Sequence, residues 1–336
     1  MRTILQQGVI SCLACLLLLS GTIQAQQLTT LPGQNRSTTG SAAISSKKIL
    51  AFPFKDVDRF PVITAVALSA DGTKVYTGGD DRQIYIWDTK KATPERHFVA
   101  HEDWIRSISA FLPNQEVATI DQLGTAKIWK TTDFSPIRTL PEKIAGAQAI
   151  AYSPNGKVLA ACGFDAQVVL FDAKSGKLLG KWSAPGTNVK TVVFSPKGEF
   201  LAAGGRNGIV RIWDTASGQV LFNLAAGTKR IHAIAFNSDG SFVAAGGEDG
   251  TITIWNTKTG KKSMTLSLEA GKVFSLVFCT DQYLASGDSF NLIRIWSLQT
   301  GKEVAHASGH TGTIATMLYD SSKKVLVRCF LVSLVI

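Results

Sequence analysis

An aromatic residue recurs along the chain at an almost constant interval, and this periodicity limits the possible folds more than any other feature. Each of these aromatics is followed by a polar residue, and the successive spacings are 42, 42, 42, 42 and 41 residues. The six positions are Trp87, Trp129, Phe171, Trp213, Trp255 and Trp296. A second marker keeps the same frame, since a glycine stands 15 residues before four of the aromatics, at Gly72, Gly156, Gly198 and Gly240. Self-similarity at this period indicates a repeat architecture.

Each period contains four short apolar stretches separated by turn signals. In the fourth period they are residues 189–195, 199–205, 209–214 and 219–225. The alternation of apolar and polar residues within them is typical of strands, and no helical periodicity is present. Four strands in about 42 residues make one blade of a β-propeller.

The repeats resemble those of the WD-repeat family, over residues 48 to about 320. The resemblance rests on Trp87-Asp88 and Trp213-Asp214, on weaker variants at the other aromatics, and on the Gly-Gly-acidic turns at 78–81 and 246–249. By this resemblance the chain is identified as an exported, bacterial-type member of the WD-repeat family. The resemblance implies a rigid propeller that binds proteins or peptides, although function does not follow from fold alone.

The strands that remain after six repeats predict a seventh blade. Residues 313–320 and 323–327 would form its first two strands, and residues 329–336 part of its third. An extra N-terminal strand within residues 47–55 would pair as the outer strand and close the ring, which hides the sheet edges. The predicted fold class is therefore an all-β, seven-bladed β-propeller of four-stranded blades spanning residues 47–336. Residues 329–336 fit the repeat poorly, through either a degraded blade or a truncated or shifted reading frame.

The N-terminal region predicts export. Residues 1–25 resemble a signal peptide, with Arg2, an apolar stretch at 9–19 and a cleavage site after Ala25. That stretch is much shorter than the roughly 20 residues of a membrane-spanning helix, so no stable membrane span is expected. Residues 26–46, rich in Ser, Thr, Gly and Gln, predict a flexible linker. The mature protein would be periplasmic or secreted.

The WD-repeat resemblance also implies a buried set of Trp, Ser or Thr, His and Asp in each blade, and here these sets look incomplete. The second blade has Trp129, Thr119 and His101, but Leu123 stands where the family has Asp. We therefore expect stability to rest mainly on apolar packing, since a half-satisfied polar network is worse than none.

Neither a metal site nor an enzyme is predicted. His97 and His101, like His306 and His310, are four residues apart, but on strands that spacing spans about 13 Å, too far for one zinc ion. No phosphate-binding loop, nucleophile elbow or catalytic carboxylate pair is present in a supporting context. We therefore expect no cofactor.

Two columns of the repeat predict a partner-binding face. One contains Val62, Trp104, Gly146, Asn188, Arg230, Lys272 and Thr313, and the next contains Thr64, Arg106, Gln148, Lys190, His232, Phe274 and Ala315. Both columns vary from blade to blade and carry charge, unlike core positions, so we expect them to be exposed near the mouth of the channel. The predicted partner-binding residues are Trp104, Arg106, Lys190, Arg230, His232 and Lys272. The alternative is an ordinary solvated rim whose cations are offset by acidic residues such as Asp80 and Glu248.

Three classes of function remain open. The favoured one is a non-catalytic platform that binds a peptide or protein segment, which the net charge of +10 suggests is acidic. The second is binding of an anionic polymer or glycan, which steep salt dependence would reveal. The third and least favoured is a propeller enzyme, which a bound cofactor or metal would reveal. Lys and Arg are spread along the chain, so nucleic acid is not an expected partner. The sequence does not predict the identity of the partner or the oligomeric state.

Overall fold

The structure of the protein is a computed structural model. It describes residues 61–307, apart from 70–71, 90–93, 112 and 228, together with five strands nearer the chain ends at 15–19, 42–43, 48–51, 314–320 and 325–330. The predicted signal peptide (1–25) and linker (26–46) lie outside the described residues except for β1 (Cys15–Leu19) and β2 (Ala42–Ala43). Thr313 and residues 331–336 also lie outside them.

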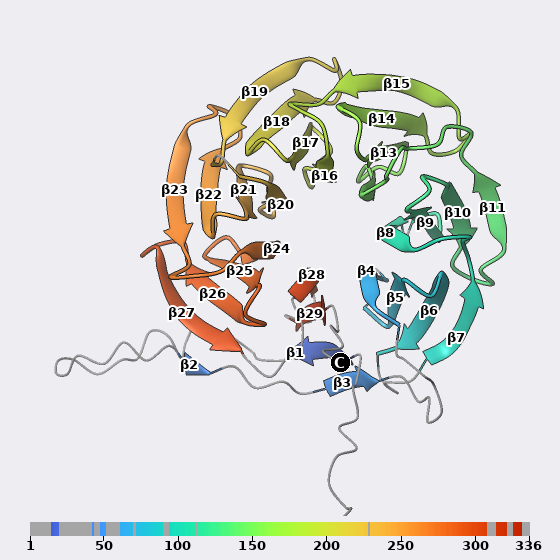
Figure 1. Cartoon of the computed structure of the whole chain (residues 1–336), viewed down its shortest axis with the longest axis horizontal. Helices are drawn as coiled ribbons and strands as arrows, with labels where there is room; N and C mark the ends of the chain where they lie inside the picture. Colours follow the sequence, from blue (N-terminus) through green and yellow to red (C-terminus); the bar gives the residue numbers. More distant parts are fainter. Residues whose placement is uncertain are drawn as a thin grey trace, which may run out of the picture.

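Six blades, each a sheet of four consecutive antiparallel strands, are arranged around a central channel (Figure 1). Blade 1 is β4 (Ile63–Leu68), β5 (Lys74–Gly79), β6 (Gln83–Asp88) and β7 (Pro94–Val99). Blade 2 is β8 (Ile105–Phe111), β9 (Glu116–Asp121), β10 (Ala126–Lys130) and β11 (Pro136–Thr139). Blade 3 is β12 (Ala149–Tyr152), β13 (Val158–Cys162), β14 (Gln167–Asp172) and β15 (Leu178–Ser183).

The other three blades repeat this order of strands. Blade 4 is β16 (Val189–Phe194), β17 (Phe200–Gly205), β18 (Ile209–Asp214) and β19 (Val220–Ala225). Blade 5 is β20 (Ile231–Phe236), β21 (Phe242–Gly247), β22 (Thr251–Asn256) and β23 (Lys262–Ser267). Blade 6 is β24 (Val273–Thr280), β25 (Tyr283–Asp288), β26 (Ile293–Ser297) and β27 (Lys302–Ala307), and β2 pairs with the outer edge of β27.

The prediction of seven blades is wrong: six blades are built from consecutive strands of the repeat. The sheet between blades 6 and 1 is a composite of both chain ends, in the order β28 (Ile314–Asp320), β29 (Val325–Phe330), β1 and β3 (Lys48–Ala51). We call it the closing sheet. β28 lies beside both β24 and β4, so the closing sheet occupies the space between the first and last blades.

The expected place of residues 329 and 330 in a third strand is also wrong, while the rest of that predicted strand, 331–336, lies outside the described residues. Cys329 and Phe330 extend β29, because Phe330 pairs with Ile314 at the start of β28. The third position of the closing sheet is instead held by β1, which pairs with β29 and β3. That strand comes from the segment predicted to be a signal peptide.

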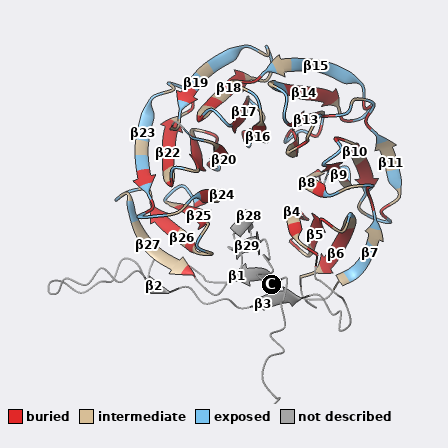
Figure 2. Cartoon of the chain, viewed as in Figure 1, coloured by how far each residue is buried: buried red, intermediate tan, exposed pale blue. Residues whose placement is uncertain are grey.

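The repeat aromatics form the core of the six blades, as their period predicts. Each lies opposite an apolar residue of the second strand, and all six are buried, from Phe171 at 0% exposure to Trp129 at 6%. Trp129 of blade 2 packs with Ile84 and Ile86 of blade 1, so the hydrophobic core lies between neighbouring blades. Figure 2 shows that exposed residues gather on the outermost strands, whereas the inner three strands are mostly buried.

Backbone irregularities recur in the same repeat frame. The glycines of the second sequence marker, such as Gly72 and Gly240, have φ angles of 59° and 79°, in the left-handed region that their turns require. A β-bulge also interrupts the pairing of the first and second strands in several blades. It leaves one residue of the inner strand unpaired, for example Arg106 between the pairs Ile105↔Asp121 and Ser107↔Ile120.

Candidate binding face and channel

The bulge residues face the central channel. The structure has a cavity of about 360 Å³ there, lined by the inner strands of all six blades and by β28. One residue from each blade occupies an equivalent place in its wall. These residues, which we call the channel ring, are Thr64, Arg106, Gln148, Lys190, His232 and Phe274. All except Gln148 are the unpaired bulge residues of their strands.

The six sequence-predicted site residues divide into two groups of three. Arg106, Lys190 and His232 belong to the channel ring and are half-buried, so the expectation that they are exposed is wrong. The other three each stand immediately before an inner strand, two residues ahead of a ring position, and we call them the channel rim. They are Trp104, Arg230 and Lys272. Both groups therefore lie at the same end of the channel, at different depths.

Two ring cations share one acceptor. Arg106 Nη2 donates to Gln148 Oε1 at 3.1 Å, and Lys190 Nζ donates to the same oxygen at 2.8 Å. Gln148 Nε2 donates in turn to the carbonyl oxygen of Gly146 at 3.2 Å. A neutral amide therefore joins two cationic side chains from blades 2 and 4 through blade 3.

No carboxylate balances these cations within the channel: none of the described residues that line the cavity is acidic. The nearest acidic contact is Glu248 Oε1, 3.8 Å from Nε2 of His232. His232 has a side chain only 9% exposed, and its ring stacks on Phe274 with centroids 4.7 Å apart. Both of its ring nitrogens, and Nε of Arg106, are buried without a hydrogen-bond partner.

Burial and mutual repulsion shift the ionisation of this group. Burial, reinforced by the positive charges of Arg106 and Arg230, lowers the pKa of Lys190 to about 8. Burial and the charge of Lys190 lower the pKa of His232 to about 4, with Arg230 and Lys272 adding to the effect and Glu248 opposing it. His232 is therefore neutral at pH 7, and its ring can donate from one nitrogen and accept at the other.

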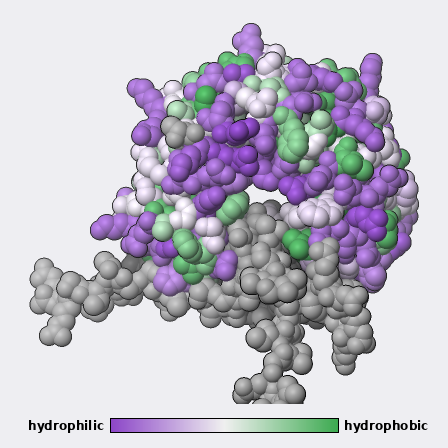
Figure 3. All heavy atoms as spheres, in the orientation of Figure 1, coloured by the Kyte–Doolittle hydropathy of each residue, from purple (hydrophilic) through white to green (hydrophobic). Residues whose placement is uncertain are grey.

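The channel rim combines charge with exposed apolar surface. Trp104 is 44% exposed, and Lys272 is also exposed, whereas Arg230 is half-buried with Nε lacking a partner. Figure 3 shows a hollow at the centre of the face in view, bordered largely by hydrophilic residues with smaller hydrophobic patches. We use the term channel face for the end of the propeller that carries the channel rim.

Three further exposed apolar residues on the channel face were missed in the sequence. Leu123, Phe164 and Phe290 lie in turns between the second and third strands of blades 2, 3 and 6. Phe164 lies over Gly146 and Phe290 over Gly271, since a methyl group on either glycine would overlap the ring. The sequence feature that could have indicated them is an apolar residue in a turn that carries an acidic residue, such as Asp81 or Glu248, in other blades.

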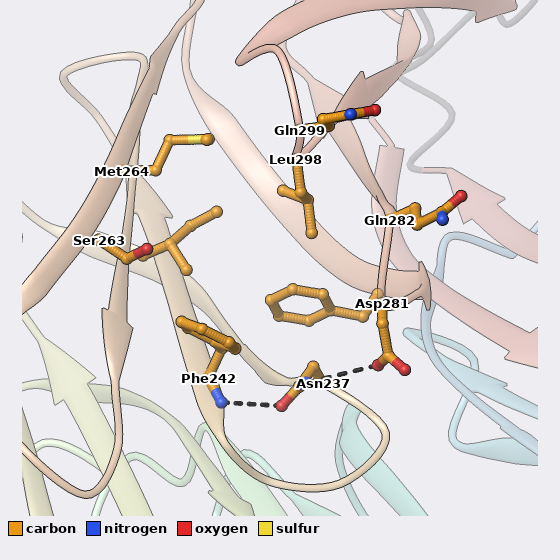
Figure 4. A pocket seen from close by; sticks show the side chains of 10 residues that line it. Asn237, Phe242, Ser263, Met264, Asp281, Gln282, Leu298 and Gln299 are labelled. Carbon is orange, nitrogen blue, oxygen red and sulfur yellow. Dashed lines mark hydrogen bonds between the residues drawn. The ribbon is translucent and has the colours of Figure 1, made fainter.

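A second cavity, of about 370 Å³, lies between blades 5 and 6 and is more apolar. Figure 4 shows Phe242, Met264 and Leu298 lining it, with Asp281 at one side. Asp281 Oδ1 accepts hydrogen bonds from Ser238 Oγ at 2.8 Å and from Asn237 Nδ2 at 3.4 Å. Its carboxylate is therefore used within the fold, unlike the unpaired donors of the channel.

Blade 2 contains a buried polar network that is more complete than the sequence predicts. His101 Nδ1 lies 3.0 Å from Asp121 Oδ2, and its Nε2 lies 2.7 Å from Thr119 Oγ1. Trp129 Nε1 donates to the same hydroxyl at 2.8 Å. The carboxylate comes from Asp121 at the end of β9, so the expectation that Leu123 leaves this set without one is wrong.

Within the described residues, no three His, Cys, Asp or Glu side chains are grouped so that they could hold a metal ion. His97 instead stacks on Tyr85, with Nδ1 2.8 Å from Gln83 Oε1. The same part of the chain contains no helix that is long and apolar enough to cross a bilayer.

Comparison with protein families identifies the repeat. The family described as "Nucleolar protein 10-like, N-terminal domain", a β-propeller, matches residues 141–322, more than half of the 336 residues. The family described as "WD domain, G-beta repeat" matches residues 58–88. The sequence-based assignment to WD repeats and a β-propeller is thus confirmed.

Several curated proteins match part of the chain. Protein LST8 homolog of Drosophila melanogaster is 31% identical over 100 residues, 30% of this chain and 32% of that protein. Transcription factor unc-37 of Caenorhabditis elegans is 27% identical over 122 residues, 33% of this chain and 20% of that protein. Polyadenylation factor subunit 2 of Candida albicans is 24% identical over 115 residues, 34% of this chain and 21% of that protein. The matches span from a fifth to about a third of these relatives, all eukaryotic, so the expected bacterial-type membership has no support among them.

Proposed function

The chain belongs to the family of nucleolar protein 10-like β-propellers, and we propose that it is a non-catalytic scaffold that binds a peptide or protein segment on the channel face. WD-repeat propellers generally act as scaffolds for protein interactions. The observation that carries the proposal is the combination, at one end of the channel, of exposed apolar side chains with cations that lack acidic partners in the cavity.

Trp104 is the proposed anchor of this interaction. Its side chain is 44% exposed and joins none of the hydrophobic clusters of the described core. Tryptophan and arginine are enriched among interface residues that carry most of the binding energy. A partner that covers Trp104 and crosses the mouth of the channel would also reach Arg230 and Lys272, which precede the inner strands of blades 5 and 6.

The test is partner capture by the full chain from an extract, followed by affinity measurement. Trp104→Ala should weaken binding by about 2 kcal/mol, the typical cost of removing such an anchor. Leu179→Ala is the matched control, because Leu179 is an exposed apolar residue on the outer strand β15, away from the channel. Equal capture by both variants and the wild-type chain would reject this anchor.

Charge is expected to act mainly on the rate of association with an acidic partner. Arg230→Glu combined with Lys272→Glu should lower the association rate and its dependence on salt, since cations steer acidic segments to the face. Lys258→Glu, on the turn after β22, is the control. Capture of an anionic glycan in place of a protein would instead favour the anionic-polymer alternative.

We further propose that the protein is exported, with cleavage after Ala25. The supporting observation is the short apolar stretch at residues 9–19 followed by small and polar residues. Cleavage after Ala25 would remove β1 from the closing sheet. A mature protein cleaved there therefore cannot contain the closing sheet with β1 in it. Intact mass of protein from its own host decides between them: loss of residues 1–25 supports export, and retention of Met1 contradicts it.

A further inference from the structure

The channel wall has two chemically different arcs. Blades 2 to 5 place Arg106, Gln148, Lys190 and His232 next to one another around the channel ring, whereas blades 6 and 1 contribute Phe274 and Thr64. Positive charge is therefore concentrated on one side of the cavity. Thr64 uses its one hydroxyl hydrogen within the fold, where the carbonyl oxygens of Gly78 and Ile105 are both within hydrogen-bonding reach of Oγ1.

The cationic arc has hydrogen-bonding capacity that the protein does not use. Among the residues that the structure describes, Gln148 Oε1 is the one side-chain acceptor for both Arg106 and Lys190. Arg106 Nε and the two ring nitrogens of His232 are buried without a hydrogen-bond partner, although Glu248 Oε1 lies 3.8 Å from Nε2 of His232. Leaving a buried donor unpaired lowers the stability of the fold, and more so for a charged group, so a fold selected for stability alone gains nothing from this arrangement.

The backbone directs these side chains into the channel. Arg106, Lys190 and His232 are each the extra residue of a β-bulge. Bulges are over-represented near functional sites, where they re-aim a side chain. His232 is further held by stacking on Phe274. The donors are therefore oriented before any ligand binds, which reduces the entropic cost of binding.

We propose that this arc is an oxyanion-binding site, in which Arg106 and Lys190 bind a phosphate or carboxylate group and His232 donates a hydrogen bond from its neutral ring. Arg106 can present Nε and an Nη donor together, the geometry that suits an oxyanion. A bound anion would also relieve the repulsion between Arg106 and Lys190, which now have no acidic partner among the cavity residues.

Two kinds of ligand could supply an oxyanion to this site. A cavity of about 360 Å³ can hold a small free oxyanion such as phosphate, or the end of an acidic side chain. The rim residues Arg230 and Lys272 lie close enough to lower the pKa of His232, so positive potential extends from the mouth to the ring. If the ligand is an acidic segment of a partner, the inference rests on the proposed function. If the ligand is a free anion, it does not.

Gln148→Glu is the sharpest test. The change is nearly isosteric and places a carboxylate between Arg106 and Lys190, so the protein would supply its own anion. We expect the variant to unfold at a higher temperature than the wild-type chain and to lose its response to inorganic phosphate. Since phosphate stabilises many proteins without specific binding, the response is compared with that of Lys258→Met, which keeps the channel intact and should behave like the wild type.

Lys190→Met provides the complementary variant, with similar length and no charge. Titration calorimetry of the full chain with inorganic phosphate, at constant ionic strength, should show affinity reduced roughly tenfold or more, the effect of losing one charge-assisted hydrogen bond. An acidic hexapeptide of glutamates is titrated in parallel. Binding of phosphate alone identifies a free anion, and binding of the peptide, with or without phosphate, identifies an acidic segment.

The inference is overturned if neither probe binds the wild-type chain, or if Gln148→Glu and Lys258→Met respond to phosphate equally. It is also overturned if Lys190→Met binds both probes as the wild type does. Failure of the proposed function is a separate result: without any captured protein, phosphate binding that depends on Gln148 and Lys190 would still establish the anion site.

Discussion

Two buried polar clusters in neighbouring parts of the propeller differ in how completely their hydrogen bonds are made. In blade 2, His101, Thr119, Asp121 and Trp129 satisfy one another at 2.7 to 3.0 Å. In the channel, Arg106 and His232 keep buried nitrogens without partners. A saturated cluster stabilises and fixes the fold, whereas an unsaturated one lowers stability and leaves donors for a ligand.

The blade 2 network should be the more costly to break. Asp121→Ala removes a buried carboxylate that faces His101 and also accepts from the amide of Thr125 at 2.8 Å. Breaking a buried, hydrogen-bonded pair typically costs about 3–5 kcal/mol. Urea denaturation measures this loss, with Glu102→Ala, an exposed acidic residue nearby, as the control. A loss below about 1 kcal/mol would show that the network contributes little.

The channel cluster should instead make stability depend on alkaline pH. Lys190 has a pKa of about 8 in the folded protein against an ordinary 10.5. Between these values the unfolded chain binds more protons than the folded one, so the free energy of unfolding rises with pH, by up to about 3 kcal/mol. Arg106, Arg230 and the thiol of Cys162 also face this amine, and burial keeps that thiol neutral by raising its pKa to about 12.

Denaturation at pH 7, 8, 9 and 10 measures this rise. Lys190→Met should lack it and should be at least as stable as the wild-type chain at pH 7, because the change removes a buried charge. A rise of equal size in the variant would mean that another group causes it.

Thr119→Val tests the shared hydroxyl of the blade 2 network while keeping the shape of the side chain. Trp129 Nε1 and His101 would both lose their partner. We expect the free energy of unfolding to fall by about 1–3 kcal/mol, the cost of leaving buried donors unpaired. Thr73→Val, a half-buried threonine of the turn before β5, is the comparison; an equal loss there would remove the special role of Thr119.

The smallest effect on stability is expected on the channel rim. Trp104→Ala should change the free energy of unfolding by less than about 0.5 kcal/mol, as exposed positions away from packed features usually do. Thermal unfolding checks this directly. A large loss would assign Trp104 to the core of blade 2 and remove the basis for its role as an anchor.

The sequence could predict the features that recur with the repeat. The repeat aromatics and turn glycines mark the strands, and variation within a fixed frame located Arg106, Lys190 and His232 in one column. The repeat period could not distinguish the channel ring from the channel rim. How deep a side chain lies in the channel depends on the β-bulge between Ile105 and Ser107 and on the equivalent bulges of other blades. It also could not show that Gln148 joins two cations.

The errors arose where pairing departs from the repeat. The repeat frame predicts the carboxylate of blade 2 at position 123, which is Leu123, yet Asp121 at the end of β9 reaches His101. The seventh repeat blade was extrapolated from leftover strands at the C-terminus, but its third place is filled by β1, roughly 300 residues away along the chain. A local period contains no information about such distant pairing.

The bulge at the start of the inner strands has a consequence for how such a propeller can change its ligand. Because each bulge residue is excluded from ladder pairing, its identity is free of the packing rules that restrict its neighbours. Here that one place holds threonine, arginine, lysine, histidine and phenylalanine in blades 1, 2, 4, 5 and 6 without altering the strands around it. The side chains of the channel ring can therefore be substituted independently of the blades. A change in ligand preference needs only a few substitutions at these positions.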